Sequence, residues 1–119
     1  THLASGRALP ILGDVAQTGT VVVGVSCLED LTDIKAACRG KLAVLGNLNA
    51  IEMRRWSAVE TEAAVRRAIV QAGPGGGFIL ADNHGEIPWQ VPDEVLMAVA
   101  EAARRWGRYP LQEAQRGGA

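Results

Sequence analysis

Three short apolar runs, each followed by a stretch with helical spacing, limit what this chain can fold into. The runs are Thr20–Val25, Lys41–Gly46 and Gly77–Ala81. None alternates apolar with polar residues, and continuous runs of this length are typical of strands buried on both faces of a parallel sheet. Their separation of roughly 20 to 35 residues fits right-handed β–α–β crossovers. We therefore expect an α/β fold with parallel strands.

The segments between and after these runs carry helix signals. Ser57 and Glu60 form a capping box, which predicts a helix that ends at Gly73. Pro92, followed by two acidic residues, predicts a last helix that ends at Gly107. Residues 7–17 are also expected to be helical. We expect these apolar residues to be buried: Leu28, Leu31, Ile34 and Ala37; Val59, Ala63, Ile69 and Val70; and Val95, Leu96, Val99, Ala102 and Trp106.

The chain is short for the closed form of such a fold. It has 119 residues, whereas an eightfold α/β barrel typically needs about 250. We expect one domain, residues 1–111, that holds about half of a barrel, followed by a flexible tail at 112–119. A small open sheet is the alternative. With a net charge of −1 and an aromatic content of 4%, the sequence lacks the basic patch with interleaved aromatic residues that is typical of nucleic-acid binding. No apolar run is long enough to span a membrane. We expect a cytoplasmic protein.

The loop after the third run contains the first candidate for chemistry, His84. Loops at the carboxyl ends of parallel strands are where ligands bind and reactions take place in this class of fold. An imidazole there can exchange protons near neutral pH. Gly85 permits close backbone approach, and Asp82 and Asn83 could orient the ring. The alternative is a surface histidine without a role.

Other polar residues follow the same logic. Asn47 and Asn49 come at the end of the second run, where their amides can donate and accept hydrogen bonds, or where an asparagine can form a left-handed turn. If a strand precedes His2, then His2 would lie at the same end of the parallel strands as His84. Two histidines can contribute to a zinc site, but such a site needs a third protein ligand. Neither Cys27 nor Cys38 supplies it convincingly, and both are expected to be free thiols.

An ordered set of motifs resembles the C-terminal part of the uroporphyrinogen decarboxylase superfamily. The motifs are His2–Gly6, Pro10–Leu12, Gly46–Asn49, Gly75–Leu80, Asn83–Gly85, Val91–Pro92 and Trp106–Pro110. The resemblance covers residues 2 to 110. It implies a (β/α)₈ TIM barrel, of which this chain would be the C-terminal portion, with parallel strands inside and helices outside.

The resemblance implies two chemistries. Decarboxylases of the superfamily are lyases of porphyrin biosynthesis that remove acetate carboxyl groups from a tetrapyrrole without metal or cofactor. Their relatives move a methyl group between a corrinoid and a thiol, with zinc held by a histidine and two cysteines. His2 resembles that histidine, but Ala4 stands in place of one cysteine and the other would fall near His84. In the decarboxylases' Gly-Asn-Leu-Asp motif, Asn49 replaces the aspartate.

The decarboxylase is the leading hypothesis, without metal or cofactor. On this hypothesis His84 is catalytic, and the substrate-binding residues are His2, Asn47, Asn49, Asn83 and Gly85. The alternative is the methyltransferase, with a corrinoid partner and with His2 and His84 as zinc ligands. A third is a non-catalytic interaction domain whose open edges pair with another chain. The resemblance places the family's principal acid and arginines in the N-terminal half. We therefore expect the isolated chain to be inactive and to need a homo-oligomer or that half.

Overall fold

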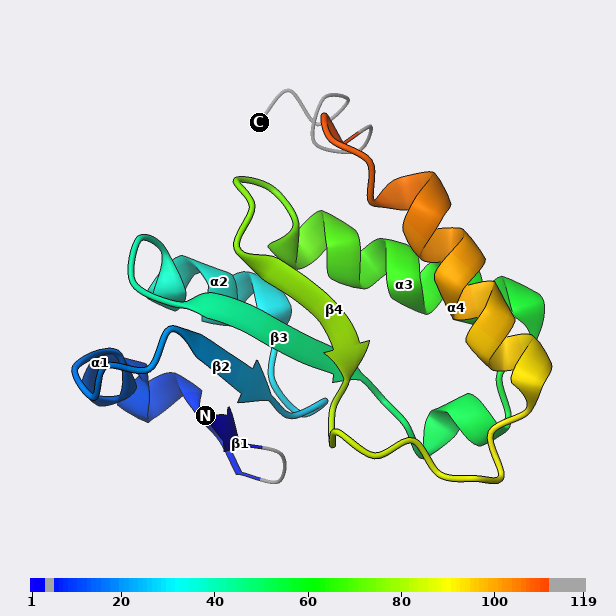
Figure 1. Cartoon of the computed structure of the whole chain (residues 1–119), viewed down its shortest axis with the longest axis horizontal. Helices are drawn as coiled ribbons and strands as arrows, with labels where there is room; N and C mark the ends of the chain where they lie inside the picture. Colours follow the sequence, from blue (N-terminus) through cyan, green and yellow to red (C-terminus); the bar gives the residue numbers. More distant parts are fainter. Residues whose placement is uncertain (4–5, 112–119) are drawn as a thin grey trace.

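A parallel sheet of four strands forms the centre of the molecule (Figure 1). The computed structural model describes residues 1–3 and 6–111, so the predicted tail lies outside the described residues. The strands are β1 (His2–Leu3), β2 (Val22–Val25), β3 (Ala43–Leu48) and β4 (Phe78–Asp82). They lie in the order β1-β2-β3-β4, and each pair is parallel. The predicted α/β class is confirmed, and β1 is an additional strand at the edge.

Helices connect the strands. The chain runs through a 3₁₀ helix η1 (Leu9–Ile11), α1 (Leu12–Ala16), α2 (Leu31–Cys38), a 3₁₀ helix η2 (Glu52–Arg54), α3 (Ala58–Ala72) and α4 (Asp93–Trp106). The helix predicted over 7–17 is therefore shorter and is divided into η1 and α1. The capping box of α3 is confirmed, because the Glu60 amide donates to Ser57 Oγ at 3.1 Å and the Ser57 amide donates to Glu60 Oε1 at 3.0 Å.

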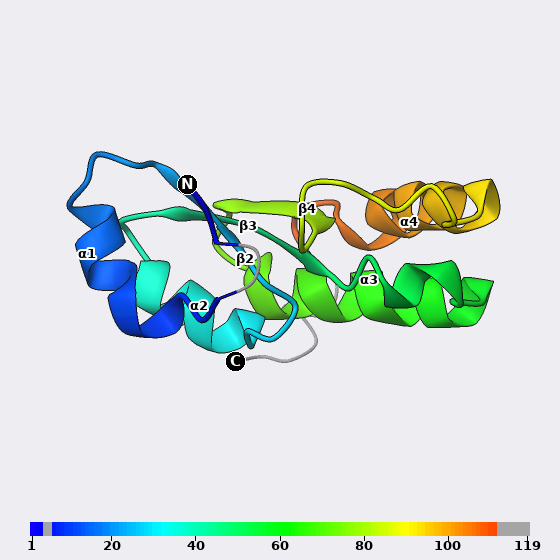
Figure 2. The same cartoon turned by 90° about the horizontal axis from the view of Figure 1, so that it is seen from below.

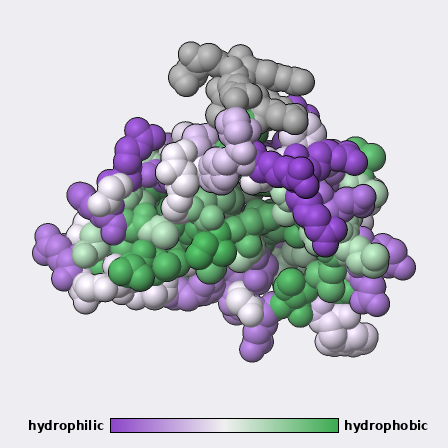
Figure 3. All heavy atoms as spheres, turned by 45° about the horizontal axis from the view of Figure 1, so that its top comes forward, coloured by the Kyte–Doolittle hydropathy of each residue, from purple (hydrophilic) through white to green (hydrophobic). Residues whose placement is uncertain are grey.

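Three of the described helices, α1, α2 and α3, cover one face of the sheet. Figure 2 shows them on one side of the strands, with α4 level with the sheet beside β4, and no helix of the described residues covers the other face. Val23, Val25 and Val44 are fully buried, as expected for alternate side chains that face the helices. Leu45 and Ile79 are register partners on the uncovered face. In Figure 3, hydrophobic residues form a broad area across the middle of the molecule.

Several apolar residues expected in the core are exposed. Leu28 lies before α2, because Asp30 caps that helix by accepting hydrogen bonds from the Thr32 and Asp33 amides. The exposed residues are Leu28, Ala37, Val59, Ala63, Val70 and Leu96. Leu28, Leu31, Ile34 and Ala37 recur every three residues, and this spacing drifts around a helix that has 3.6 residues per turn. The buried residues of α2 are Leu31, Ile34 and Cys38, and those of α3 are Thr61, Val65, Ala68, Ile69 and Ala72.

Lys35 of α2 fixes the start of β4. Its ammonium group donates to the carbonyl oxygen of Ala72 at 2.8 Å, at the end of α3, and to that of Gly76 in the turn that follows. Burial lowers the pKa of Lys35, and the nearby Arg39 lowers it further. This contact joins two helices to the strand that leads into the His84 loop. No helix in the described part of the chain is long and apolar enough to cross a membrane.

Candidate active site at the carboxyl edge of the sheet

The loops after β2, β3 and β4 lie at one edge of the sheet, because all the strands are parallel. Asn83 joins these loops. Its side-chain Nδ2 donates to Cys27 Sγ at 3.2 Å, and its Oδ1 accepts from the Ala50 amide at 3.1 Å. Only 8% of Asn83 is exposed. Asn83, a predicted substrate-binding residue, therefore uses both ends of its amide within the protein.

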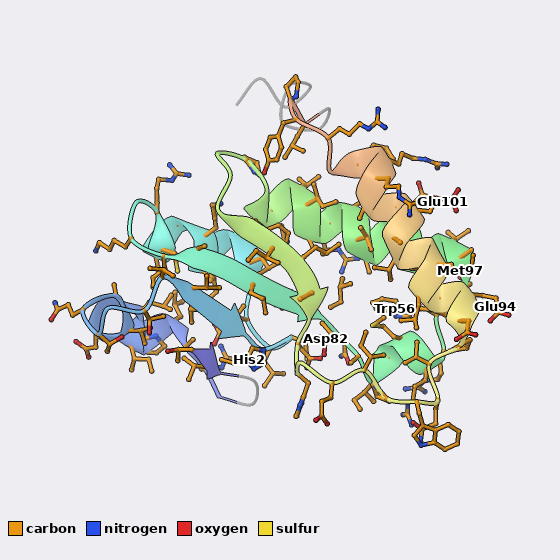
Figure 4. All side chains as sticks on the ribbon, in the orientation of Figure 1. His2, Trp56, Asp82, Glu94, Met97 and Glu101 are labelled. Carbon is orange, nitrogen blue, oxygen red and sulfur yellow. The ribbon has the colours of Figure 1, made fainter. Side chains whose placement is uncertain are left out.

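Asp82 shapes the loop that carries His84. Its Oδ2 accepts hydrogen bonds from the His84 amide at 3.0 Å and from the Gly85 amide at 2.8 Å. Gly85 has a φ of 90°, a conformation that favours glycine. Asp82 thus fixes the backbone of the turn, whereas the sequence suggested that it orients the imidazole ring. Figure 4 shows Asp82 at the end of β4.

His84 lines an open groove of about 490 Å³ at this edge. One wall comes from Ala50 and Ile51 after β3, and the other comes from Asn83 and from Glu86 to Trp89 after β4. Ile51, Ile87 and Trp89 expose large apolar side chains there. The volume lies within the range of small-molecule sites, which combine apolar walls with a few polar groups. His84 and Glu86 are the ionisable groups of this groove.

Asn47 and Asn49 line a separate pocket of about 290 Å³, between the loops after β2 and β3 and helix α3. The Asn47 amide donates to the carbonyl oxygens of Ser26 at 2.8 Å and Glu29 at 2.9 Å. Asn49 Oδ1 accepts from the Glu52 amide at 3.2 Å. No residue other than glycine has a positive φ in the described ranges, so the left-handed asparagine turn is wrong. The predicted binding residues divide between two hollows.

His2 lies on the uncovered face of the sheet. It belongs to β1 and pairs in register with Gly24 of β2, so it does not follow a strand as the sequence suggested. Its ring lies against Gly24, where a Cβ would overlap His2 Cδ2. Figure 4 shows His2 beside the end of β2. His2 is therefore near the same edge but on the face that the helices leave open.

The described residues do not fit a zinc site by themselves. Within 1–3 and 6–111, no group of three or more His, Cys, Asp and Glu side chains is placed to hold a metal ion. Cys38 is buried in α2, and burial raises the pKa of its thiol. Zinc needs at least three protein ligands. The alternative pair of His2 and His84 thus remains a prediction that requires a ligand from outside this part.

Sequence reasoning missed the loop after β2. Glu29 is buried there, and its Oε1 accepts from the Ala8 amide at 2.7 Å. Cys27 accepts from Asn83 and lines the pocket that contains Asn47. The polar stretch from Ser26 to Asp30 follows an apolar run just as the His84 loop does. That similarity is the signal that could have found these residues.

Comparison with known proteins places these observations in a family. The sequence matches the family Uroporphyrinogen decarboxylase (URO-D) over residues 1–106. None of the curated proteins matches. A solved methyltransferase from Methanosarcina mazei is similar in fold, with a TM-score of 0.73 and 21% identity over 90% of this chain. This chain covers 31% of that methyltransferase, so its four-stranded sheet is consistent with part of a TIM barrel. The chain belongs to the uroporphyrinogen decarboxylase (URO-D) family.

Proposed function

We propose that this chain forms the C-terminal part of a barrel lyase that removes acetate carboxyl groups from a tetrapyrrole, with His84 as its catalytic residue. The observation that carries the proposal is the position of His84. It lies on a turn fixed by Asp82, directly after β4, and it lines the groove at the carboxyl edge. This edge is where barrel enzymes of every chemistry place their reactive groups.

The chemistry of decarboxylation explains why an imidazole suits this position. When CO₂ leaves, the electron pair of the broken carbon–carbon bond stays on the methylene carbon. That carbon must take up a proton to become a methyl group. An imidazolium can donate this proton near neutral pH, and an imidazole can hydrogen-bond to the neighbouring carboxylate. Gly85 leaves room for the substrate beside the ring, and the apolar walls of the groove suit the pyrrole rings of a tetrapyrrole.

The remaining proposed substrate-binding residues supply hydrogen bonds from other directions. Asn47 and Asn49 lie in the neighbouring pocket at the same edge. The Asn49 amide nitrogen can donate to a carboxylate of a large substrate, whereas the Asn47 amide nitrogen already donates to two backbone carbonyl oxygens, so Asn47 would bind substrate through its Oδ1 as an acceptor. His2 would contact the substrate from the uncovered face of the sheet. Asn83 contributes by holding the three loops together. The rest of the barrel, or a second copy of this chain, supplies the groups that this part lacks.

The proposal is tested with His84→Asn in the complete barrel that contains this chain. Decarboxylation of uroporphyrinogen is measured by chromatography of the products. We expect kcat to fall by about 10²- to 10⁴-fold, the usual contribution of a positioned proton donor, with a smaller change in KM. Gln90→Ala, an exposed substitution in the same loop, serves as the control. A folded His84→Asn protein that keeps kcat within about threefold would refute the proposal.

Zinc-dependent methyl transfer with a corrinoid partner is the second candidate. It is favoured by the imidazole of His2 on the uncovered face of the sheet. Metal analysis of the complete protein and of its His2→Ala variant tests it. One zinc per protein that is lost in the variant would support this candidate. A protein that holds no zinc and exchanges no methyl group with methylcobalamin would eliminate it.

A further inference from the structure

Gly24 occupies a strand position that does not need a glycine for its backbone. It lies inside β2, between Val23 and Val25, and its φ is outside the left-handed range. A glycine in the interior of a strand weakens the strand, and it often marks a place where another group approaches closely. The neighbouring residues of β2 are all valines, which favour strands. The reason for a glycine at position 24 therefore lies outside β2.

The close approach at Gly24 is that of the His2 ring. A Cβ at Gly24 would overlap His2 Cδ2 and would lie 2.9 Å from both Cγ and Nε2 of the same ring. These three atoms form one side of the imidazole, so the Nδ1 and Cε1 side points away from Gly24. The ring fills the space in which a side chain of β2 would otherwise stand.

The backbone holds the two residues at this separation. The Gly24 amide donates to the Thr1 carbonyl oxygen at 2.8 Å, and the Thr1 nitrogen donates to the Val22 carbonyl oxygen at 3.1 Å. His2 and Gly24 are direct register partners. Because β1 cannot move away without breaking this ladder, a side chain at position 24 would have to displace the ring itself.

We infer that Gly24 is a positioning residue for His2. By leaving room for the ring, Gly24 holds the His2 imidazole on the uncovered face of the sheet, toward the space that a barrel would enclose. In the same row across that face lie Leu45 and Ile79, which are successive register partners of Gly24. His2 thus places the one ionisable group of this row next to apolar neighbours. The inference rests on the proposed function only in its claim that His2 contacts the substrate.

The positioning itself is tested with Gly24→Ala, His2→Ala and the double variant of this chain. Alanine is more favourable than glycine in the interior of a strand, but here its methyl group would collide with the His2 ring. We expect Gly24→Ala to lower the melting temperature when His2 is present and to raise it when residue 2 is alanine. NMR titration of the imidazoles should show a changed His2 signal and an unchanged His84 signal. Val22→Ala, the preceding position on the same face, is the matched control.

The functional claim is tested in the complete barrel with uroporphyrinogen as the probe. We expect Gly24→Ala to lower kcat/KM about tenfold, with a shifted pH profile, and to have no further effect in the His2→Ala background. Equal changes in melting temperature in both backgrounds with an unmoved His2 signal would overturn the inference. An unchanged kcat/KM despite a displaced ring would overturn the role of His2 in binding. Neither result bears on His84, whose own variant tests the proposed function separately.

Discussion

The side chain of Asn83 shows how a single residue can hold the candidate site together. It bonds to the loop after β2 through Cys27 and to the loop after β3 through Ala50, while its own backbone belongs to the loop after β4. Buried polar groups are nearly always hydrogen-bonded, because an unpaired one loses its contacts with water and gains nothing. Asn83 therefore couples the positions of all three loops.

Replacement of Asn83 by alanine should destabilise the protein. We expect a loss of about 1–3 kcal/mol in the free energy of unfolding, because the buried Ala50 amide loses its acceptor. Urea denaturation followed by circular dichroism measures this loss. Gln90→Ala, which truncates an exposed amide of the same loop, should change stability by less than about 0.5 kcal/mol. Equal effects of the two substitutions would contradict the role assigned to Asn83.

The sequence located the His84 loop correctly but not the tasks of its neighbours. A polar loop after an apolar strand predicts a position at the carboxyl edge of a parallel sheet, and His84 lies at that edge. The partner of Asn83 is Cys27, which comes 56 residues earlier in the chain. No local pattern connects residues so far apart. The contacts of Asp82 with the His84 and Gly85 amides are local, because aspartate side chains commonly bond to the backbone two residues further on, and that turn pattern could have predicted them.

At the scale of elements, the amino terminus of α3 combines structure with a titratable group. The Ser57 amide donates a hydrogen bond to the Glu60 carboxylate. This bond, and the side-chain contact with Ser57, lower the pKa of Glu60 below its ordinary value of 4.5. A depressed carboxyl pKa means that the charged form is favoured by folding. Its contribution to stability is complete above pH 4.5 and is lost as the pH falls through the lower, folded value.

The melting temperature should reveal this contribution. Glu60→Gln keeps the length of the side chain but removes its titration. We expect the wild type to be more stable than the variant near pH 7 and the difference to shrink as the pH falls below 4.5. Differential scanning fluorimetry between pH 7 and about pH 3 follows the change. Glu101→Gln, on the exposed side of α4, is the comparison variant, and a difference that grows toward acid pH would count against the capping role.

Strands and capping boxes are encoded locally, whereas buried helix faces depend on the rest of the fold. The apolar runs predicted β2, β3 and β4, and Ser57 with Glu60 predicted where α3 begins. The first strand has only two residues and is defined by its pairing with β2, so no pattern within it could reveal it. In α3, Val59 is 77% exposed although it is apolar, because the direction of the sheet, and not hydrophobicity alone, decides which face is buried.

At the scale of the whole molecule, the sheet has a covered face and an uncovered one. The uncovered face carries Leu45 and Ile79, and Ile79 is 47% exposed. Among the described residues, no further strand pairs with the outer edge of β1 or of β4. Exposed strand edges and apolar faces favour association. We propose that the rest of a barrel or a second copy of this chain covers this surface.

This surface predicts concentration-dependent association of the isolated chain. Light scattering coupled to size-exclusion chromatography, or native mass spectrometry, should detect dimers or larger species. Ile79→Asp should reduce the association, because a charge on the uncovered face resists burial. Val70→Asp on α3 is the matched control, since Val70 is similarly exposed at 41% but lies on a helix. A stable monomer, or equal effects of both substitutions, would contradict the prediction.

The order of the strands along the sheet is the same as their order along the chain. Each β/α unit therefore touches mainly the units made immediately before and after it. During synthesis, a newly completed strand can dock onto a neighbour that already exists, without waiting for a distant segment. The sheet can therefore grow by the addition of each new strand to one edge, as the repeats of a solenoid protein add to their neighbours. In a closed barrel, the outer side of β4 would pair with the strand at the opposite end of the series, and this pairing would complete the ring of strands.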